Sequence, residues 1–367
     1  MRRLLIYTNG CEQRMLDMEY FKHLATVNGD RVVSDTSEAD TVLYVSCCVS
    51  RFACETATRE IISYCSKGVS VIVYGCLPGI ESEWLDSLGL AHYTVQQREC
   101  LVTDMNWSIS VPYPILNVQD NPSITLAGES PRIQFDRAKL GKKLVICNGC
   151  LNQCTYCVIR FATGQLKSKP ISEIVQEWRE TVRQGDHVML MGGDTGAYGM
   201  DIGTNLPQLL EALQAENIVA DIFLHDLNIR WMRKILEAFC NVIGSQSFVR
   251  GLTLPIQSGS DEILASMKRH YTAEDIHTCF HQIREVAPDL IMGTHVIVGY
   301  PGETEVCFNE TVKLLKQLPL DFISCFPYSE HEKADSAALW PKVPPQRICE
   351  RIDYLGAVFG NKLKAYT

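Results

Sequence analysis

The sequence predicts an α/β protein in which a small parallel-sheet N-terminal domain precedes a partial (β/α)6 TIM-type barrel. Short apolar runs alternate with helical patterns along most of the chain, which is typical of parallel sheets covered by helices. A polar stretch with four prolines at 106–141 separates the two sets of elements. We therefore expect a first domain at 1–120, a linker at 121–141 and a second domain at 142–367.

Three strand-like runs and two helical patterns define the first domain. We expect strands at 4–8, 41–45 and 69–74, and helices near 15–26 and 56–66. A cysteine follows each strand at its C-terminal end, and these sheet-edge cysteines are Cys11, Cys47 and Cys76.

The carboxyl ends of strands are where open α/β sheets bind ligands, so the three sheet-edge thiolates should converge. We predict that they hold an iron–sulfur cluster with one open iron. The alternative is that they are buried small residues, because free cysteine is commonly buried. Cys48 adjoins Cys47, but the alternation of a strand would point the two side chains apart.

Six strand–helix units define the second domain. The active sites of such barrels lie at the carboxyl ends of the strands. The expected strands are 143–147, 188–191, 218–224, 251–255, 291–298 and 322–326, and the expected helices are 171–184, 206–215, 228–239, 260–267, 272–287 and 305–318.

The most informative motif is a CxxxCxxC array directly after the first barrel strand. Its members, the loop cysteines, are Cys150, Cys154 and Cys157. Four-iron clusters normally take four thiolates, so three leave one iron open. S-adenosylmethionine (SAM) can chelate that iron, and SAM and Fe–S clusters carry radical chemistry. A zinc knuckle or buried thiols are the alternatives, but zinc favours paired CxxC or mixed Cys/His sets, and no second pair follows.

The end of the second barrel strand is a candidate for binding SAM. Gly192, Gly193 and Asp194 follow the second barrel strand. The glycines would let backbone approach a ligand, and the Asp194 carboxylate could hold the SAM amine. An ordinary glycine-rich turn explains the same residues equally well.

The fourth and fifth barrel strands also end in candidate contacts. Gln257 could hydrogen-bond a ribose, while Ile297 and Gly299 suit a flat adenine ring. Three other polar residues near strand ends are interpreted as structural, namely His225, Asp226 and His295.

Composition restricts the class of protein. The chain has 367 residues, a net charge of −9 and 16 cysteines. The acidic balance argues against a large nucleic-acid surface, which needs clustered Lys and Arg. We find neither an export signal nor an apolar run of membrane-spanning length, so we expect no membrane contact. Abundant cysteine without export predicts a reducing, cytoplasmic location.

The motifs resemble those of the radical-SAM methylthiotransferase family, most closely its tRNA threonylcarbamoyladenosine methylthiotransferases. The resemblance covers nearly the whole chain. Its motifs are Gly10-Cys11, Ser46-Cys47 and Gly75-Cys76, and the stretches GCLNQCTYCVIRFATGQLK, DTGAYGMDIGTNL, PIQSGSDEIL and GYPGETE.

The resemblance implies SAM and two [4Fe–4S] clusters as cofactors. A cluster on the loop cysteines would reduce SAM to a 5′-deoxyadenosyl radical, which abstracts hydrogen from a substrate carbon. An auxiliary cluster on the sheet-edge cysteines would supply the sulfur, which a second SAM methylates in this family. The electron donor would be a reductant of the flavodoxin or ferredoxin type.

The chain also departs from the family pattern. We expect it to lack the RNA-binding TRAM domain, because it ends at Thr367. Arg14 stands in place of an asparagine, His331 in place of an arginine, and the segment ending at His225 lacks the family's arginine. We therefore favour sulfur insertion into a nucleoside-type small molecule. The alternatives are a tRNA threonylcarbamoyladenosine methylthiotransferase without TRAM and a non-catalytic Fe–S electron carrier.

Overall fold

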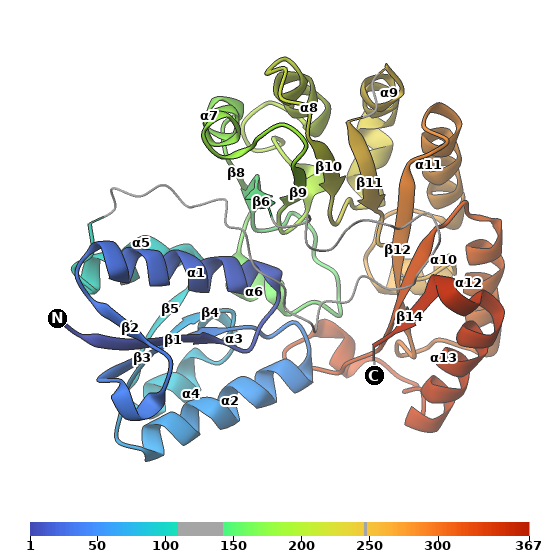
Figure 1. The fold of residues 1–367 in the computed structure, drawn as a ribbon. Coiled ribbons are helices and arrows are strands. Elements are labelled where there is room, and N and C mark those ends of the chain that lie inside the picture. Colours follow the sequence, from blue (N-terminus) through green and yellow to red (C-terminus); the bar gives the residue numbers. More distant parts are fainter. Residues whose placement is uncertain (109–141, 246–247, 367) are drawn as a thin grey trace. The chain divides into compact units, whose positions relative to one another are not determined.

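The computed structural model describes residues 1–108, 142–245 and 248–366, which divide into two compact units (Figure 1). The first unit contains residues 1–108 together with two segments from later in the chain, 157–164 and 329–334. The second contains the remaining described residues. The expected linker at 121–141 lies outside the described residues, so the domain boundaries stay a prediction.

The first unit is built on a five-stranded sheet in which every neighbouring pair is parallel, as the sequence predicts. The strand order is β2-β1-β3-β4-β5. The bounds are β1 Arg3–Thr8, β2 Arg31–Val33, β3 Thr41–Ser46, β4 Ser70–Gly75 and β5 Ala91–Thr94. The two edge strands, β2 and β5, were not predicted.

Helices cover both faces of this sheet (Figure 1). Leu4 and Ile6 pack against Phe21 on one face, where α1 (Glu12–Val27) and α5 (Arg98–Asp104) lie. Leu5, between them in sequence, packs on the other face with residues of the remaining helices, as strand alternation requires. Those helices are α2 Arg51–Ser66, α3 Leu77–Ile80 and α4 Ser82–Ser87, and α6 Ile159–Thr163 packs against α3.

The strand order places a topological switch point between β1 and β3. These strands are hydrogen-bonded neighbours, yet β1 leads into α1 on one face and β3 leads into α2 on the other. In the 2-1-3-4-5 arrangement, the loops that diverge here form the ligand-binding crevice. The loops after β1 and β3 are therefore the expected place for chemistry in this unit.

The second unit is a seven-stranded, all-parallel sheet with the order β14-β13-β12-β11-β10-β9-β6. The bounds are β6 Lys142–Val145, β9 His187–Met191, β10 Asp221–Leu224, β11 Val249–Thr253, β12 Ile291–Val298, β13 Phe322–Pro327 and β14 Leu363–Ala365. This sequential order confirms the predicted partial barrel and adds β14 as a seventh strand. A separate antiparallel pair joins β7 (Cys147–Asn148) to β8 (Lys167–Ser168).

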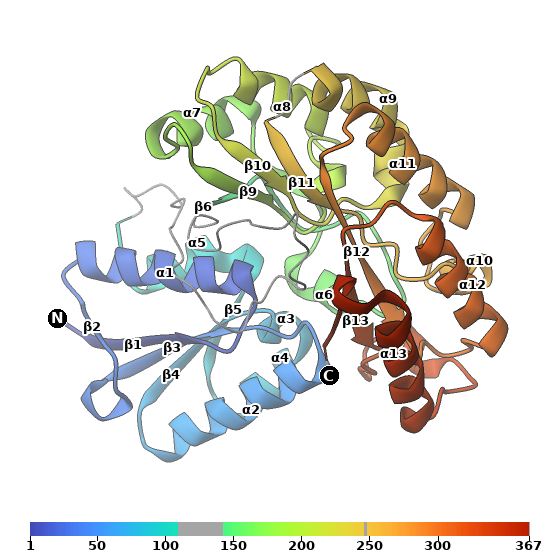
Figure 2. The same cartoon turned by 45° about the vertical axis from the view of Figure 1, so that its right-hand side comes forward.

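Helices line the outer side of the curved sheet (Figure 2). Six of them match the predicted helices to within a few residues at their N-terminal ends. The helices are α7 Ile171–Thr181, α8 Leu206–Gln214, α9 Ile229–Ser245, α10 Asp261–Ser266, α11 Ala273–Val286, α12 Glu305–Gln317 and α13 Pro345–Phe359. The last of these was not among the predicted elements.

Candidate functional site

The sheet-edge cysteines emerge at one edge of the first unit's sheet. Thr8 pairs with Val45 and Ser46 with Gly75, so the residues that follow β1, β3 and β4 leave the sheet together. Cys47 and Cys76 are buried and Cys11 is exposed. A hydrogen bond between the Cys11 and Cys47 thiols raises the pKa of Cys11 and lowers that of Cys47. Burial raises the pKa of Cys76 to about 11, and the Cys11 charge adds to that rise.

Two glycines make this arrangement sterically possible. A Cβ on Gly10 would lie 2.5 Å from the Cys47 Cβ. Gly75 has a φ of +116°, and a Cβ there would overlap the Ser46 carbonyl oxygen. The Gly-Cys pairs of the sequence thus have a steric cause, which is the close approach of the loops that carry the cysteines.

Asn9 ties the loops after β1 and β3 together and was missed in the sequence. Its Oδ1 accepts a hydrogen bond of 2.8 Å from the Cys47 backbone N–H, and its Nδ2 donates to the Cys47 carbonyl at 3.2 Å. This side chain therefore fixes the backbone of a sheet-edge cysteine on both sides. An asparagine after a strand gives no distinctive signal in a single sequence.

Cys48 lies in the same apolar core cluster as Cys76. It packs with residues of α2 and α3, and a hydrogen bond with Cys54 raises the pKa of its thiol strongly. The Cys54 Sγ in turn lies 3.8 Å from His331 Nε2. Cys47 and Cys48 both follow Ser46, the last residue of β3, so strand alternation does not apply to them, and the choice of Cys47 as a ligand stays a prediction.

The loop cysteines are divided between the two units. Cys150 and Cys154 belong to the second unit, whereas Cys157 opens the 157–164 segment of the first unit. Cys154 is buried, and Cys150 and Cys157 are half-buried. Val145 pairs with Met191, so the cysteine loop and the loop after β9 emerge at the same edge of the barrel sheet.

Cys150 lies beside a buried, well-oriented carboxylate. Asn152 Nδ2 donates to Cys150 Sγ at 3.2 Å and to Asp194 Oδ2 at 2.6 Å. Trp231 Nε1 donates to the same Asp194 oxygen at 2.8 Å. Burial raises the pKa of Asp194 to about 6, against the lowering effects of Arg269, Asn152 and Trp231. The carboxylate is thus held at a defined position 3.9 Å from the Cys150 sulfur.

Cys154 lies beside a buried guanidinium that sequence reasoning missed. Arg269 Nη1 donates to Cys154 Sγ at 3.4 Å. Arg269 Nη2 donates to the Pro255 carbonyl at 2.8 Å, and its Nε donates to Tyr271 Oη at 2.7 Å. These contacts hold a cation next to a proposed cluster ligand. Nothing in the local sequence around Arg269 distinguishes it from a surface arginine.

The glycines after β9 are explained by packing. A Cβ on Gly192 would overlap Cys147 Sγ, and a Cβ on Gly193 would overlap the Gly149 carbonyl oxygen. Both glycines therefore allow the loop after β9 to lie against the start of the cysteine loop. Their contact with SAM, like that of Asp194, stays a prediction.

Gln257 and Ile297 lie side by side at the strand ends. The Ile297 N–H donates to the Gln257 carbonyl at 2.9 Å, and Gln257 has a φ of +70°, an uncommon value for a non-glycine residue. A Cβ on Gly299 would overlap Ile348 of α13, so packing also favours glycine there. The Gly299 N–H donates to Glu303 Oε2 at 2.7 Å. Their contacts with ribose and adenine remain predictions.

The polar residues interpreted as structural form a cluster. His225 Nδ1 lies 3.0 Å from Asp226 Oδ2, and His295 Nδ1 lies 3.8 Å from Asp226 Oδ1. Burial raises the pKa of Asp226, but the two imidazoles outweigh it and bring that pKa down to about 2. Burial lowers the pKa of His295 to about 4. The Asp226 carboxylate therefore lies between two histidines, His225 and His295.

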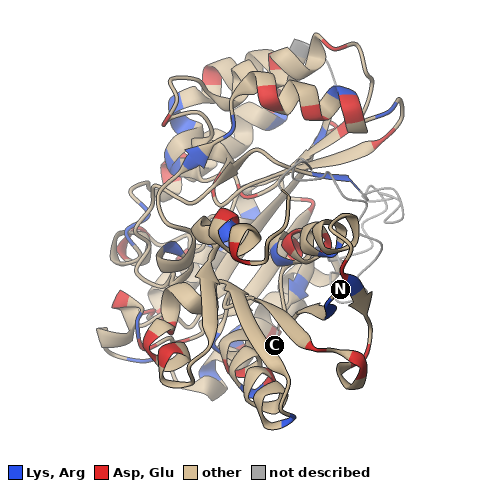
Figure 3. Cartoon of the chain, turned by 90° about the vertical axis from the view of Figure 1, so that its left-hand side faces the viewer, with Lys and Arg blue, Asp and Glu red and all other residues tan. Residues whose placement is uncertain are grey.

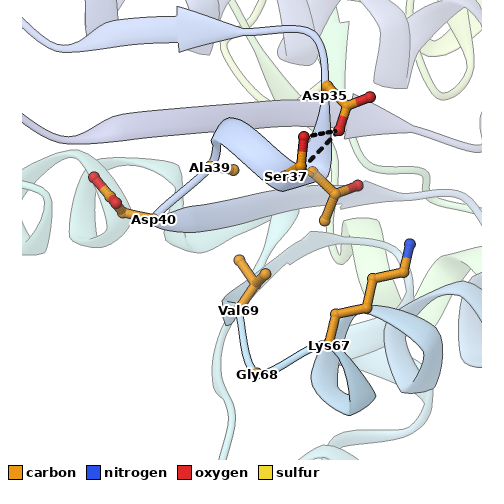
Figure 4. Close-up of a pocket in the computed structure, with 8 residues that line it drawn as sticks. Asp35, Ser37, Ala39, Asp40, Lys67, Gly68 and Val69 are labelled. Atoms are coloured by element: carbon orange, nitrogen blue, oxygen red, sulfur yellow. Dashed lines mark hydrogen bonds between the residues drawn. The ribbon is translucent and has the colours of Figure 1, made fainter.

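A cavity of about 780 Å³ lies at the opposite edge of the first unit's sheet (Figure 4). Its lining includes Asp35 and Asp40, which precede β3, and Lys67 and Val69, which precede β4. Because ligands of open α/β sheets bind at the carboxyl ends of strands, this cavity is not part of the candidate site.

All six residues of the two cysteine trios carry thiols, the ligands that iron–sulfur clusters take. Among the described residues, no three His, Cys, Asp or Glu side chains are close enough to hold one metal ion. In a four-iron cluster each thiolate binds its own iron, so the thiolates need not converge on one point. Within the same residues, no helix has the length and apolar character needed to cross a bilayer.

Two protein-family models match the chain. The Radical SAM superfamily matches residues 144–315, and Uncharacterized protein family UPF0004 matches residues 3–92. The first match includes the loop cysteines and the second includes the sheet-edge cysteines.

Curated relatives match over almost the whole chain. The probable threonylcarbamoyladenosine tRNA methylthiotransferase of Pyrococcus abyssi is 30% identical over 356 residues, covering 96% of this chain and 82% of the relative. The tRNA-2-methylthio-N(6)-dimethylallyladenosine synthase of Fervidobacterium nodosum is 29% identical, covering 95% and 81%. The threonylcarbamoyladenosine tRNA methylthiotransferase of Homo sapiens is 31% identical, covering 98% and 62%.

Solved structures share the fold. The radical S-adenosylmethionine methyltransferase TsrM from Kitasatospora setae has a TM-score of 0.58 at 14% identity, covering 89% of this chain and 73% of that one. The cobalamin-dependent S-adenosylmethionine radical enzyme OxsB has a TM-score of 0.54 at 10% identity, covering 92% and 54%. At these identities the likeness shows the fold alone.

The family implies SAM and two [4Fe–4S] clusters as cofactors. That the two trios of cysteines hold these clusters stays a prediction. The matches to both models and to full-length relatives agree with the motifs read from the sequence. This chain belongs to the radical-SAM methylthiotransferase family.

Proposed function

We propose that this enzyme replaces a C–H bond of an adenosine-type base in tRNA with a methylthio group. The observation that carries the proposal is the 30% identity over 96% of the chain to a relative named for threonylcarbamoyladenosine in tRNA. Relatives of this kind shift the balance from a small nucleoside, which the sequence favoured, to tRNA. They also leave the electron-carrier interpretation without support, because they are named as enzymes.

The loop cysteines would hold the cluster that engages SAM. When bound, SAM with this cluster supplies radical chemistry. Asp194 supplies the negative charge that would hold the SAM amine, and Asn152 and Trp231 fix the direction of its carboxylate. Arg269 would offset the negative charge gathered at Cys154.

The sheet-edge cysteines would hold the auxiliary cluster that provides the sulfur. They emerge at the carboxyl edge of the sheet, two of them at the switch point between β1 and β3. Gly10 and Gly75 give the loops room to approach, and Asn9 fixes the Cys47 backbone. The electron donor would be a flavodoxin- or ferredoxin-type protein.

A nucleoside-type small molecule is the second candidate substrate. The chain has a net charge of −9, and in the view of Figure 3 its Lys and Arg residues are scattered among Asp and Glu. A tRNA-binding protein ordinarily gathers its positive charge on one face.

An activity assay with each candidate substrate in turn decides between tRNA and the free nucleoside. Anaerobically reconstituted enzyme, SAM and dithionite would be incubated with tRNA lacking the modification or with the matching free nucleosides. Mass spectrometry of digested tRNA should show a gain of one sulfur and one methyl group on an adenosine. Cys47→Ala should give no product, whereas the neighbouring Cys48→Ala should retain it.

Each result has a definite meaning. Product on the free nucleoside but not on tRNA would overturn the tRNA proposal in favour of the second candidate. Production of 5′-deoxyadenosine with no sulfur in either substrate would contradict both.

A further inference from the structure

Arg14 is a buried cation in the first turn of α1, a position that is unfavourable for a positive charge. Arg14 is the third residue of α1, and only 1% of its surface is exposed. Burial of a charge is costly unless the charge is paired and hydrogen-bonded. A cation in the first turn of a helix also opposes the helix dipole, whose N-terminal end is positive. The position therefore calls for nearby negative charge.

Asp17 supplies only part of that compensation. Its Oδ2 lies 3.0 Å from Arg14 Nη1, and both side chains are almost completely buried. However, Arg14 Nε and Nη1 have no hydrogen-bond partner among the described residues. A buried pair with unused donors is weak evidence for a purely stabilising role, since apolar residues of similar size often stabilise as well or better.

The Arg14 Cζ also lies 6.0 Å from the centroid of the Tyr74 ring, and the sheet-edge cysteines are further neighbours. The Arg14 charge lowers the pKa of both Cys11 and Cys76, against the stronger effects that raise them. The position of a Cβ on Gly10 would be 3.0 Å from the Arg14 Cβ and 2.5 Å from the Cys47 Cβ. The Arg14 side chain is thus buried beside the sheet-edge cysteines, and two of its nitrogens have no hydrogen-bond partner among the described residues.

We propose that Arg14 is a positioning residue for the auxiliary cluster, in which its unused N–H groups donate to the cluster and its charge raises the cluster's reduction potential. The proposal rests on the assignment of that cluster to the sheet-edge cysteines. Three thiolates outweigh the charge of an oxidised four-iron core, so the cluster is an anion that becomes more negative on gaining an electron. A fixed cation in a medium of low dielectric constant stabilises the reduced state more than the oxidised one.

A potentiometric titration of the auxiliary cluster alone tests the proposal. The full chain would carry Cys150→Ala, Cys154→Ala and Cys157→Ala, so that only the sheet-edge cysteines can bind a cluster. Dithionite would deliver one electron per cluster, and electron paramagnetic resonance would follow the reduced form. Arg14→Gln should lower the reduction equilibrium constant at least tenfold, which is about 59 mV for a one-electron couple.

Two further variants separate charge from folding. Arg14→Lys keeps the charge and should hold the potential closer to that of the parent. Asp17→Asn removes the opposing charge and should move the potential in the opposite direction from Arg14→Gln. If Arg14 and Asp17 served the fold only, Arg14→Gln and Asp17→Asn would shift the reduction potential in the same direction or leave it unchanged. These two variants also decide the question if Arg14→Gln does not assemble a cluster.

The outcomes distinguish this inference from the function on which it rests. If the parent protein binds iron and its potential equals those of the Arg14→Gln and Asp17→Asn variants, the role of Arg14 alone is overturned. A parent protein that binds no iron would overturn the cluster assignment itself, and the role of Arg14 with it.

Discussion

Trp231 donates its indole N–H to Asp194 at 2.8 Å, although the two residues are 37 positions apart. The acceptor oxygen also receives the Asn152 amide, so it has two donors at fixed positions. A carboxylate held in this way loses little side-chain entropy on binding a cation. These two hydrogen bonds fix the orientation of the Asp194 carboxylate before a ligand binds.

Asp194→Asn should weaken SAM binding. Loss of a charge-assisted hydrogen bond of about 1.5–3 kcal/mol corresponds to roughly a 10- to 100-fold rise in Kd. Trp231→Phe keeps the charge and should cost less, roughly fivefold, for a loss of about 1 kcal/mol. Equilibrium dialysis of SAM against the reconstituted proteins gives the three constants. Unchanged affinity in Asp194→Asn would place the SAM amine elsewhere.

The two trios of cysteines should be separable by activity. Cys154→Ala should abolish formation of 5′-deoxyadenosine, because its cluster engages SAM. Cys47→Ala should retain that activity and lose sulfur transfer. Chromatography of 5′-deoxyadenosine and mass spectrometry of the product measure the two steps. Cys349→Ala, which changes an exposed thiol, is the matched control. Loss of both activities in both single variants would contradict the division of roles.

Arg269→Lys should impair the second unit's site even though the charge is kept. A lysine ammonium cannot reproduce the fork that contacts Cys154, Pro255 and Tyr271 together. Changes to residues that orient metal ligands typically cost about 10- to 100-fold. We expect a fall of this size in the rate of SAM cleavage with most of the iron retained. An unaltered rate would show that Arg269 serves the fold only.

The sequence predicted the long apolar elements well. Residues 291–298 were expected as a strand, and β12 has those bounds, because an eight-residue run of mostly apolar and β-branched residues ends at a glycine. The strands β2, β5 and β14 were missed, since three or four residues carry too little alternation to identify. α2 begins at Arg51 rather than near residue 56, and the Ser50 cap that starts it was a readable signal.

The residues of the candidate site could be predicted only where they form a short motif or follow a predicted strand. Both cysteine trios could be read from motifs and strand ends. Arg269 lies 115 positions from Cys154, and no pattern in one sequence pairs residues so far apart. Gly192 and Gly193 were predicted to let backbone approach a ligand, and in the structure a Cβ on either would meet Cys147 or Gly149. The histidines around Asp226 were dismissed singly because their meeting depends on the curvature of the barrel.

The buried Glu303–Arg351 pair predicts a pH-dependent stability. The Arg351 Nη1 lies 2.7 Å from Glu303 Oε2, yet burial outweighs this pairing and raises the pKa of Glu303 from 4.5 to about 7. Because the folded state binds the proton more tightly, the contribution of Glu303 to stability is complete below pH 4.5 and falls as the pH rises to about 7. The loss across that window is ~3 kcal/mol.

Urea unfolding of the metal-free protein at pH 5 and pH 7.5 measures this effect. The stability of the wild type relative to Glu303→Gln should fall between the two pH values. Parallel behaviour of the two proteins would contradict the prediction. Arg351→Met should cost about 3–5 kcal/mol at the higher pH, because it leaves a buried carboxylate without its counter-charge.

The fit of Gly193 against the Gly149 carbonyl restricts how this enzyme can be recombined with its relatives. The two loops behave as a matched pair, so a chimaera that imports one of them from a homologue with a different backbone path would bring a steric clash into the middle of the barrel mouth. Segment exchange in this family should therefore transfer residues 147–157 and 191–196 together.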